Sequence, residues 1–224
     1  KYLTHCPNNL NFIESSSIWM QYLTAYYPFV EIAKIKEGDF VLIGAASSSA
    51  GLGAIDIVKS CGGNIIATTR SDKKITLLQN YGADEVINST KDTFSEKIIE
   101  ITKGVGVRAV YDPIGNPFYE QYLDTLQMGS IIFHFGLLSG QSIKLDISRH
   151  VRKNSYLLPY SMFNYVSEKS SLLRGINYVL KKIDEGIFKP KIDKVFPFEN
   201  TIEAYNYLLE YDVMGKIVVE VNNS

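Results

Sequence analysis

A single segment, residues 40–59, constrains the fold of this chain more than any other. It reads FVLIGAASSSAGLGAIDIVK, in which an apolar run breaks into small residues and then resumes at helical spacing. The continuous apolar run at 40–43 is typical of a strand buried on both faces, as in a parallel sheet. From Gly51 onward, Leu52, Ile55 and Val58 recur at helical intervals, which predicts a helix that packs back on that sheet.

The loop between this strand and this helix suits a ligand that carries phosphate groups. Every residue from Gly44 to Gly51 is Gly, Ala or Ser, so a ligand can approach the backbone. The N-terminus of the helix adds N–H groups and a partial positive charge. The dinucleotide fingerprint Gly-x-Gly-x-x-Gly falls on Ala46, Ser48 and Gly51, so only its third glycine is kept. Taken alone, the loop does not separate a nucleotide-binding protein from another α/β protein.

Strands and helices alternate on both sides of this segment. Upstream, a serine at 15–17 can cap a helix that Pro28 ends or kinks, and a short second helix is expected at 30–33. Downstream, the pattern predicts strands at 64–69, 85–88, 108–111 and 130–135, with helices at 72–81, 93–102 and 119–126. Short glycine-containing links join them, which is the pattern of a Rossmann-type doubly wound parallel sheet with helices on both faces.

The rhythm changes after residue 145. A last sheet strand is expected at 156–160 and a helix at 168–185, followed by an extended piece at 194–196, a helix at 199–209 and a strand at 216–221. The last three elements are too few to build a core of their own, so we expect them to pack on another domain. We therefore divide the chain into a connector at 1–14, a dinucleotide-binding domain at 15–190 and a C-terminal segment at 191–224.

Composition argues against several other classes of protein. The net charge of −1 gives no long-range field that would attract nucleic acid or an anionic membrane. The two cysteines, Cys6 and Cys61, form no CxxC pair, which argues against a zinc lobe and a disulfide framework and favours a reducing, cytoplasmic setting. No apolar stretch approaches the roughly 18 to 20 residues of a membrane span, and the first residues lack the shape of a signal peptide.

The end of the second predicted strand bears on the choice of cofactor. In a dinucleotide fold this tip meets the adenosine ribose, about 20 residues after the glycine loop. Here it reads Thr69-Arg70-Ser71-Asp72, followed by Lys73 and Lys74. Arg70 and a lysine would offer positive charge to a 2′-phosphate and Ser71 a hydrogen bond, which favours NADPH. Two alternatives stay open: Asp72 could bind the ribose of NADH, although it better suits a helix cap, or the basic residues could form a merely solvated helix start.

No residue pattern identifies a catalytic group or a metal site. The histidines are His5, His134 and His150, and none lies at metal-ligand spacing from Cys or Glu. We interpret His134 as a satisfied structural histidine of the fifth strand. There is no GxSxG elbow and no Tyr-x-x-x-Lys pair at 160–165, so catalytic residues remain unassigned and the site is predicted to be metal-free. A Rossmann-like methyltransferase is disfavoured because Arg70, and no acid, ends the second strand.

Several segments resemble the medium-chain dehydrogenase/reductase superfamily, and within it the zinc-independent quinone-oxidoreductase-like branch. They occur in order at compatible spacing: LTAY at 23–26, GDFVLI with the serine-rich loop at 38–51, YGADEVIN at 81–88, DPIG at 112–115, GLLSG at 136–140, FPF at 196–198 and GKIV at 215–218. The resemblance implies a zinc-independent, NADPH-dependent oxidoreductase that transfers a hydride to a quinone, enone or related carbonyl compound. An enoyl-thioester reductase, or a cofactor-binding relative without turnover, is the alternative.

The resemblance also implies roles for individual residues. The pyrophosphate would lie at Ser48, Ser49, Ala50, Gly51 and Leu52. The 2′-phosphate would face Arg70, Ser71 and Lys74 beside Thr69. The nicotinamide half would lie along Asp112, Pro113, Ile114, Gly136, Leu137 and Leu138, with Thr24 as a weaker candidate on its ribose side.

The sequence departs from the family pattern in two respects. Ser89 stands where the family often has a tyrosine near the adenosine phosphate. We expect that the N-terminal GroES-like domain, which the resemblance implies as the other wall of the substrate cleft, is missing ahead of residue 15. We therefore expect residues 1–14 to connect to that domain and residues 191–224 to return to it, with an open cleft and impaired hydride transfer in this chain alone. The partner is expected to be a small-molecule substrate, and a homodimer is a candidate assembly.

Overall fold

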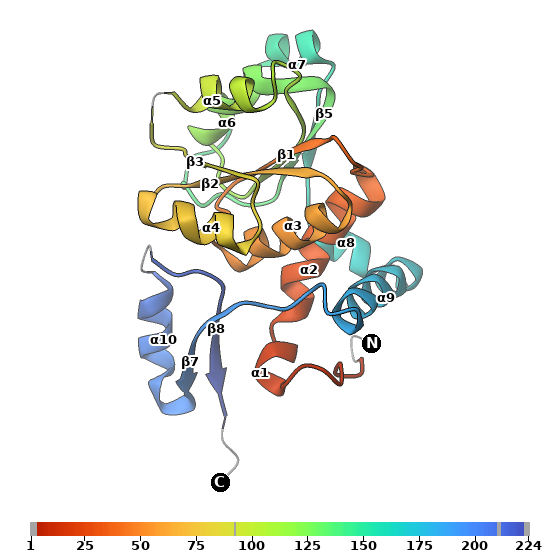
Figure 1. Cartoon of the computed structure of the whole chain (residues 1–224), viewed down its shortest axis with the longest axis vertical. Coiled ribbons are helices and arrows are strands. Elements are labelled where there is room, and N and C mark those ends of the chain that lie inside the picture. The colour runs from red at the N-terminus through yellow and green to blue at the C-terminus, as the bar shows by residue number, and fades with distance from the viewer. Residues whose placement is uncertain (1–3, 92, 210–211, 222–224) are drawn as a thin grey trace.

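A six-stranded parallel sheet forms the centre of the molecule (Figure 1). The computed structural model describes residues 4–91, 93–209 and 212–221. The strand order is β3-β2-β1-β4-β5-β6, and every neighbouring pair is parallel. The strands are β1 (Phe40–Ile43), β2 (Asn64–Thr69), β3 (Glu85–Asn88), β4 (Val107–Asp112), β5 (Leu126–His134) and β6 (Tyr156–Pro159). The order reverses between β1 and β4, which confirms the predicted doubly wound sheet.

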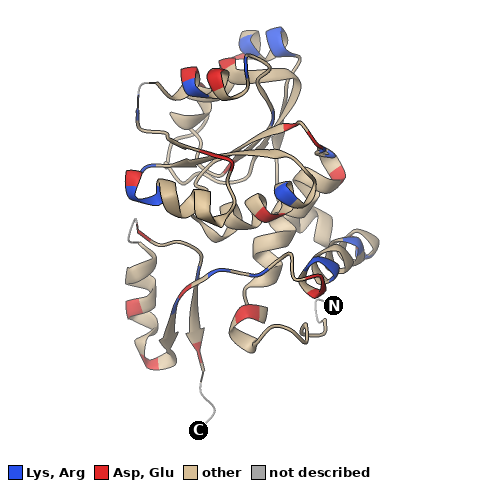
Figure 2. Ribbon diagram, viewed as in Figure 1, with Lys and Arg blue, Asp and Glu red and all other residues tan. Residues whose placement is uncertain are grey.

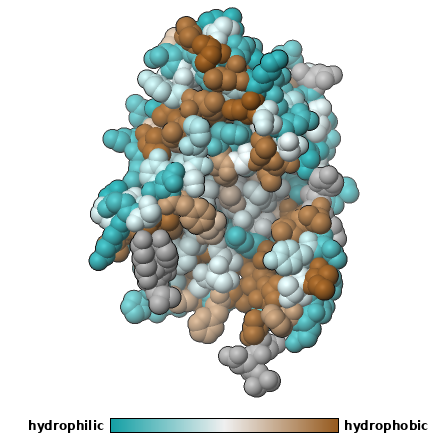
Figure 3. Space-filling model, turned by 180° about the vertical axis from the view of Figure 1, so that it is seen from behind, coloured by the Kyte–Doolittle hydropathy of each residue, from teal (hydrophilic) through white to brown (hydrophobic). Residues whose placement is uncertain are grey.

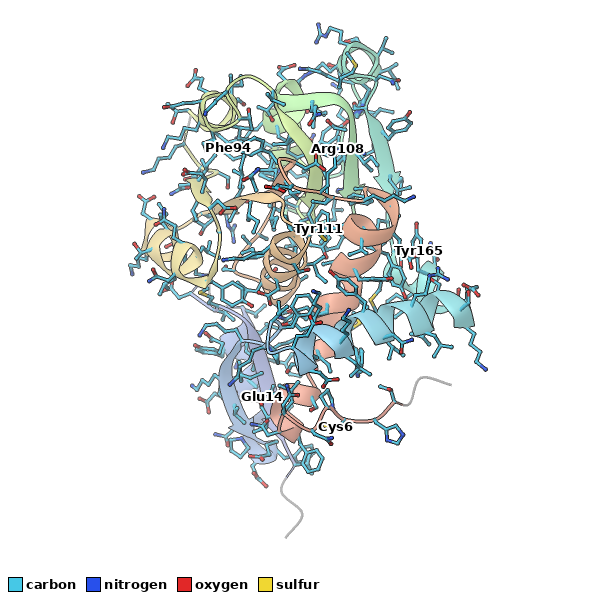
Figure 4. All side chains as sticks on the ribbon, turned by 45° about the vertical axis from the view of Figure 1, so that its right-hand side comes forward. Cys6, Glu14, Phe94, Arg108, Tyr111 and Tyr165 are labelled. Atoms are coloured by element: carbon cyan, nitrogen blue, oxygen red, sulfur yellow. The ribbon has the colours of Figure 1, made fainter. Side chains whose placement is uncertain are left out.

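Helices cover both faces of this sheet, and each face has its own core. The larger core lies beneath α2 (Ile18–Tyr26), α3 (Ser49–Ser60), α4 (Ile75–Tyr81), α8 (Met162–Val166) and α9 (Lys169–Asp184). The smaller core lies beneath α5 (Phe94–Ile101) and α6 (Phe118–Tyr122), with α7 (Ile147–Lys153) beside them. Figure 4 shows this division: Tyr111 lies in the interior on the α2 side and Phe94 on the α5 side. Alternate residues of each buried strand thus serve different cores.

The segment after α2 corrects one expectation about Pro28. The helix neither stops nor breaks there: it widens into a π-helix, η1 (Tyr27–Ile32), which replaces the separate helix expected at 30–33. Ala33 N–H donates to the Pro28 carbonyl at 2.8 Å and Ile35 N–H to the Phe29 carbonyl at 2.9 Å. Because proline has no N–H, a wide turn at this point avoids the α-helical bond that Pro28 cannot make.

Strand β5 starts earlier than predicted because it contains an irregularity. The register with β4 shifts between Val107 and Ala109, and Gly129 has a positive φ of 74°. The Ser130 hydroxyl donates to the Val107 carbonyl at 2.8 Å and thereby holds the two strands together there. The predicted helix at 119–126 accordingly ends sooner, as α6 followed by the 3₁₀ turn η3 (Leu123–Thr125).

The last elements form a separate C-terminal unit. Strands β7 (Ile192–Pro197) and β8 (Lys216–Glu220) pair in parallel, and the 3₁₀ turn η4 (Phe198–Asn200) and α10 (Thr201–Leu208) connect them. Phe196 and Ala204 are buried within it, whereas Met214 belongs to the larger core of the central domain. In the rear view of Figure 3 this unit lies at the lower right, where hydrophobic residues reach the surface. The exposed ones include Val195, Phe198, Ile202, Tyr205, Leu208 and Leu209.

The first residues that the structure describes lie against α9 and not against the sheet. The Asn9 side chain donates to the Ile183 carbonyl at 2.7 Å, and Lys189 Nζ lies 3.5 Å from Glu14. The short helix α1 (Phe12–Ser15) begins with a capping box between Asn11 and Glu14. Figure 1 shows this N-terminal segment passing beneath α9 before it enters α2.

Candidate functional site

A cavity of about 690 Å³ lies at the carboxyl ends of the strands. Parallel sheets of this kind bind ligands at that edge, where the strand order reverses. The walls come from the loop after β1, the end of β2, the β3–α5 connection, the loop after β4, α6 and the loop after β5. The lining residues are Ala45, Ser47, Thr68, Thr69, Arg70, Ser71, Lys74, Ser89, Thr90, Ile114, Pro117, Phe118, Gln121, Leu138 and Ser139.

The small-residue loop brings the start of α3 to this cavity. The Ser48 hydroxyl caps the helix by accepting from Gly51 N–H at 3.1 Å, and Ala46 N–H donates to the Thr68 carbonyl of β2. A Cβ atom at Gly51 would lie only 2.6 Å from Ala46 Cα, so glycine is required for the loop to fold back this tightly. The first turn of a helix leaves its N–H groups without partners inside the helix, and α3 therefore presents a site for an anion.

The structure places the predicted pyrophosphate residues behind this wall. Ala45 and Ser47 line the cavity, whereas Ser48, Ser49, Ala50, Gly51 and Leu52 are not among its lining residues. Gly51 and Leu52 are buried against the sheet. Their contribution is therefore the backbone geometry of the loop and the helix start.

The end of β2 contributes the cationic side of the cavity. Thr69, Arg70, Ser71 and Lys74 all line it, as the sequence predicted. Lys74 is only 5% exposed, and its ammonium donates to the Ser47 hydroxyl at 3.3 Å and to the Val213 carbonyl at 2.9 Å. Burial lowers the pKa of Lys74, and the carboxylates of Asp212 and Asp193 counteract that effect. The lysine thus lies between the nucleotide-binding domain and the C-terminal unit.

Asp72 does not cap the following helix, contrary to the expectation from its position. Its carboxylate accepts from Asn88 Nδ2 at 2.8 Å and from Lys91 Nζ at 3.0 Å, across the β3–α5 connection. The hydrogen bond from Asn88 and the contact with Lys91 lower the pKa of Asp72. The carboxylate is therefore held by the β3–α5 connection, and Asp72 is absent from the residues that line the cavity.

A buried carboxylate organises the loop expected near the nicotinamide. Asp112 Oδ1 accepts from the N–H groups of Ile114 and Gly115, at 2.7 and 3.0 Å, and Oδ2 accepts from the Tyr122 hydroxyl at 2.8 Å. His134 Nδ1 lies 3.6 Å from the same Oδ2, and the carboxylate raises the pKa of His134. Asp112 therefore shapes its turn through charge-assisted hydrogen bonds.

His134 differs from the satisfied structural histidine that we expected. Its Nδ1 atom is buried and makes no hydrogen bond to any residue that the structure describes. The nearest acceptor is the Asp112 carboxylate, at a distance that suits an ion pair better than a hydrogen bond. An imidazolium at this position is therefore stabilised by the Asp112 carboxylate.

The loops after β4 and β5 lie against each other. Leu138 N–H donates to the Pro113 carbonyl at 2.9 Å and Ser139 N–H to the Ile114 carbonyl at 3.1 Å. Ile114 and Leu138 line the cavity, and Leu138 is 71% exposed. Pro113, Gly136 and Leu137 lie in the same pair of loops but are not lining residues.

Thr24 lies apart from this cavity. It is on α2, where its hydroxyl donates to the Met20 carbonyl at 2.5 Å and lies 3.3 Å from Met162 Sδ. Its neighbours Leu23 and Met162 line a second, apolar cavity of about 240 Å³. The structure does not bring Thr24 together with the other predicted residues.

Sequence reasoning did not assign a binding role to several residues of the main cavity. Ser89 and Thr90 follow β3, Phe118 and Gln121 lie on α6, and Ser139 lies in the loop after β5. Ser89 and Thr90 could have been found from their place directly after a strand, because all strands of a parallel sheet of this kind end at the edge where ligands bind. The residues on α6 could not be found this way, because their approach depends on how that helix packs.

Charge is mixed over the surface, and the described residues provide no metal cluster. Figure 2 shows Lys and Arg interspersed with Asp and Glu, with no face of a single sign in this view. Among the residues that the structure describes, no three His, Cys, Asp or Glu side chains are grouped so that they could hold a metal ion. Within the same residues, no helix has the length and apolar character needed to cross a bilayer.

Comparison with known proteins gives consistent matches. The sequence profile described as zinc-binding dehydrogenase matches residues 50–176. A 2-haloacrylate reductase from Burkholderia sp. is 26% identical over 213 residues, which cover 94% of this chain and 64% of that protein. The chain thus spans a little less than two thirds of this curated relative.

Solved structures share the fold along nearly the whole chain. A quinone oxidoreductase of Escherichia coli complexed with NADPH superposes with a TM-score of 0.86 at 26% identity, covering 96% of this chain and 67% of that one. The CurK enoyl reductase superposes with a TM-score of 0.86, also at 26% identity, covering 96% of this chain and 65% of that one.

Proposed function

The chain belongs to the zinc-binding dehydrogenase family, in the quinone-oxidoreductase-like branch of the medium-chain dehydrogenase/reductase superfamily, and from this premise we propose that it binds NADPH and serves hydride transfer. The acceptor would be the activated double bond or carbonyl group of a quinone or enone. We further propose that the reaction needs no zinc, as the resemblance to the zinc-independent branch implies. Residues 15–190 would hold the cofactor, and residues 191–224 would return to a GroES-like domain.

One observation carries this proposal: a single cavity joins the small-residue loop to a cationic strand end. Ser47 lies where α3 begins, and Arg70 and Lys74 lie at and just after the end of β2, with the Lys74 ammonium 3.3 Å from the Ser47 hydroxyl. A helix N-terminus suits a diphosphate, and a guanidinium with an ammonium suits a phosphate monoester. NADPH carries both groups, and the structure of the Escherichia coli relative was determined with NADPH.

The residues of this chain would mainly bind and orient the cofactor. The N–H groups at the start of α3 would meet the diphosphate, and Arg70, Ser71 and Lys74 would meet the 2′-phosphate. The loops that Asp112 and the Pro113–Leu138 hydrogen bond hold in place would support the nicotinamide half. When bound, the cofactor supplies the hydride. Catalytic residues are not assigned within this chain.

An enoyl-thioester reductase is the second candidate. The CurK enoyl reductase matches this fold as closely as the quinone oxidoreductase does. The two reactions share the cofactor site and differ in the pocket that holds the acceptor. Turnover assays with a quinone, an enone and an enoyl thioester, on the same preparation, would rank the acceptors.

Cofactor titration tests the proposal directly. We expect the chain to bind NADPH more tightly than NADH in a fluorescence titration. Arg70→Ala should weaken NADPH binding by about tenfold and leave NADH binding nearly unchanged, because a charge-assisted hydrogen bond contributes on the order of 1.5 kcal/mol. Arg152→Ala, an exposed arginine on α7, is the matched control and should change neither affinity. Equal affinities for the two cofactors in the unmodified protein would refute the assignment.

A further inference from the structure

The C-terminal unit is bonded directly to the loop that begins α3. Gly215 N–H donates to the Ser47 carbonyl at 3.1 Å, and Ser48 and Gly215 form an isolated parallel β-bridge. The Lys74 ammonium joins both parts, since it donates to the Ser47 hydroxyl and to the Val213 carbonyl. In Figure 1 the chain that leads into β8 runs beside α4, on the same side of the domain. We name this set of contacts, Ser47, Lys74, Val213 and Gly215, the tether.

The tether fixes the place of Lys74 in the cavity wall. A lysine side chain has four rotatable bonds and loses conformational entropy when it is held in one place. The Val213 carbonyl, at 2.9 Å, holds the ammonium that lines the cavity. The tether therefore keeps the positive charge of Lys74 in the cavity wall, where it favours an anionic ligand.

The C-terminal unit also sets the charge around this lysine. The carboxylates of Asp212 and Asp193 act on Lys74 from the C-terminal unit, and Arg70 acts on it from the end of β2. Asp193 is itself held, because it accepts from Met214 N–H at 3.2 Å and from the Tyr207 hydroxyl at 2.9 Å. Asp212 is exposed, so its charge can be removed without opening the core.

We propose that the C-terminal unit determines the preference for a 2′-phosphorylated nucleotide by positioning Lys74 through the tether. The inference rests on the proposed function and goes beyond it. Selectivity for NADP⁺ over NAD⁺ would depend on the Val213 carbonyl and the Gly215 amide, which lie in the C-terminal unit and outside the nucleotide-binding domain. Val213 and Gly215 are positioning residues, and the ligand that they affect is the phosphate monoester on the adenosine ribose. The nicotinamide and the diphosphate do not distinguish the two cofactors, so their contribution cancels in the ratio of affinities.

Gly215→Ala breaks the tether without touching a cavity-lining side chain. Gly215 has a φ of +116°, and an added Cβ would lie 2.4 Å from the Lys191 carbonyl oxygen, so the backbone must move. We expect the ratio of the NAD⁺ dissociation constant to the NADP⁺ dissociation constant to fall by about tenfold, the loss of one charge-assisted hydrogen bond. Isothermal titration calorimetry on the full chain measures both constants. A folded Gly215→Ala variant with the unmodified ratio, or with equal losses for both nucleotides, overturns the inference.

Gly186→Ala is the matched control for Gly215→Ala. Gly186 also has a positive φ, of +70°, but an added Cβ would meet no atom within 4 Å. It therefore reproduces the backbone strain of the substitution without displacing the C-terminal unit. The affinity ratio of this variant should equal that of the unmodified protein.

Asp212→Asn decides the question if Gly215→Ala does not fold. Loss of a carboxylate near Lys74 should raise the affinity ratio in favour of NADP⁺ by about two- to fivefold, the range of an exposed charge interaction. An unchanged ratio would overturn the inference in that case. Lys74→Met, measured beside the unmodified protein, separates this outcome from failure of the proposed function. If the unmodified protein shows no preference for NADP⁺, the cofactor assignment itself is refuted. A preference that Lys74→Met abolishes, but Gly215→Ala leaves intact, refutes only the role of the tether.

Discussion

At the scale of single residues, the most perturbed acid lies outside the cofactor cavity. Asp56, on α3, accepts hydrogen bonds from the Tyr22 and Tyr81 hydroxyls at 3.0 and 2.9 Å, through the same oxygen. Burial raises the pKa of Asp56 to about 7, although these hydrogen bonds and Lys59 oppose the rise. The carboxyl group therefore joins α2, α3 and α4 and is partly protonated near neutral pH.

This carboxyl group predicts a pH dependence of stability. Because the folded-state pKa is raised above the unfolded value of about 3.9, the folded protein binds more protons between these values, and its stability falls as pH rises from about 4 to 7. In Asp56→Asn this contribution is absent. The melting temperature of the variant minus that of the unmodified protein should therefore increase from pH 5 to pH 8. Circular dichroism melts at several pH values measure it. Glu199→Gln, at an exposed acid, serves as the control, and parallel pH curves for Asp56→Asn and the unmodified protein would contradict the prediction.

A second prediction at this scale concerns the hydroxyl that Asp112 binds. Tyr122→Phe removes the donor at 2.8 Å from Asp112 Oδ2 and leaves a fully buried carboxylate with one partner fewer. We expect the free energy of unfolding to fall by about 1 to 3 kcal/mol, measured by urea denaturation. Tyr156→Phe, at an exposed tyrosine of β6, should change it by less than about 0.5 kcal/mol. Similar losses in the two variants would show that the buried hydrogen bond contributes little.

At the scale of elements, the turn from β1 into α3 depends on Gly51 having no side chain. A Cβ there would lie 2.6 to 2.7 Å from atoms of Ala45 and Ala46, and all of these are backbone atoms that cannot rotate away. Gly51→Ala should therefore destabilise the fold by roughly 1 to 3 kcal/mol and weaken nucleotide binding at the same time. Urea denaturation and cofactor titration check the two effects. Gly140→Ala, at a glycine with a positive φ and open space around it, measures backbone strain alone, which Gly51 does not carry, and should not reproduce the steric effect. Unchanged binding in Gly51→Ala would contradict the expectation.

The elements that the sequence predicted well are those whose signal is local. The run at 40–43, the small-residue loop and the helix from Gly51 specify one another through burial and close packing, and the parallel sheet with its alternating helices follows the predicted order. Pro28 misled because its missing N–H can be accommodated by a wider helical turn as well as by a helix end. Asp72 misled because Asn88 and Lys91, distant in sequence, compete for its carboxylate.

In the candidate site too, contacts between residues close in sequence could be predicted, and contacts between residues far apart in sequence could not. Thr69, Arg70, Ser71 and Lys74 lie on one short stretch after β2, so their shared wall of the cavity could be predicted. The contact between Lys74 and Val213 joins residues far apart in the chain and depends on how the C-terminal unit packs. Thr24 was placed by resemblance alone, and nothing local indicates which cavity its helix approaches. The binding roles themselves remain predictions.

At the scale of the whole molecule, the C-terminal unit is less protected than the central sheet. The residues of β8 are half-buried or exposed, whereas three of the four residues of β1 are buried. Regions with few buried apolar side chains open more readily than the core. The molecule should therefore open first at the C-terminal unit.

Hydrogen exchange followed by mass spectrometry tests this order of opening. We expect peptides from β7 and β8 to exchange at least about tenfold faster than those from β1 and β4, because local opening requires less free energy than global unfolding. Added NADP⁺ should slow exchange at 213–216 through the tether. Equal protection of the C-terminal unit and the central sheet would show that the molecule opens as one cooperative body.

In the π-helical turn η1, the number of residues matters more for the fold than their identity. It directs Phe29 into the larger core, where its ring centroid lies 5.3 Å from that of Tyr111 and 6.0 Å from that of Phe133. Deleting one residue from this turn would restore α-helical winding and rotate every preceding side chain by about 100° relative to those that follow. Either α2 or the approach to β1 would then face the wrong way. Homologues that lack the π-helical turn should therefore differ from this chain by one residue in η1. An alignment of them can reveal this difference in length.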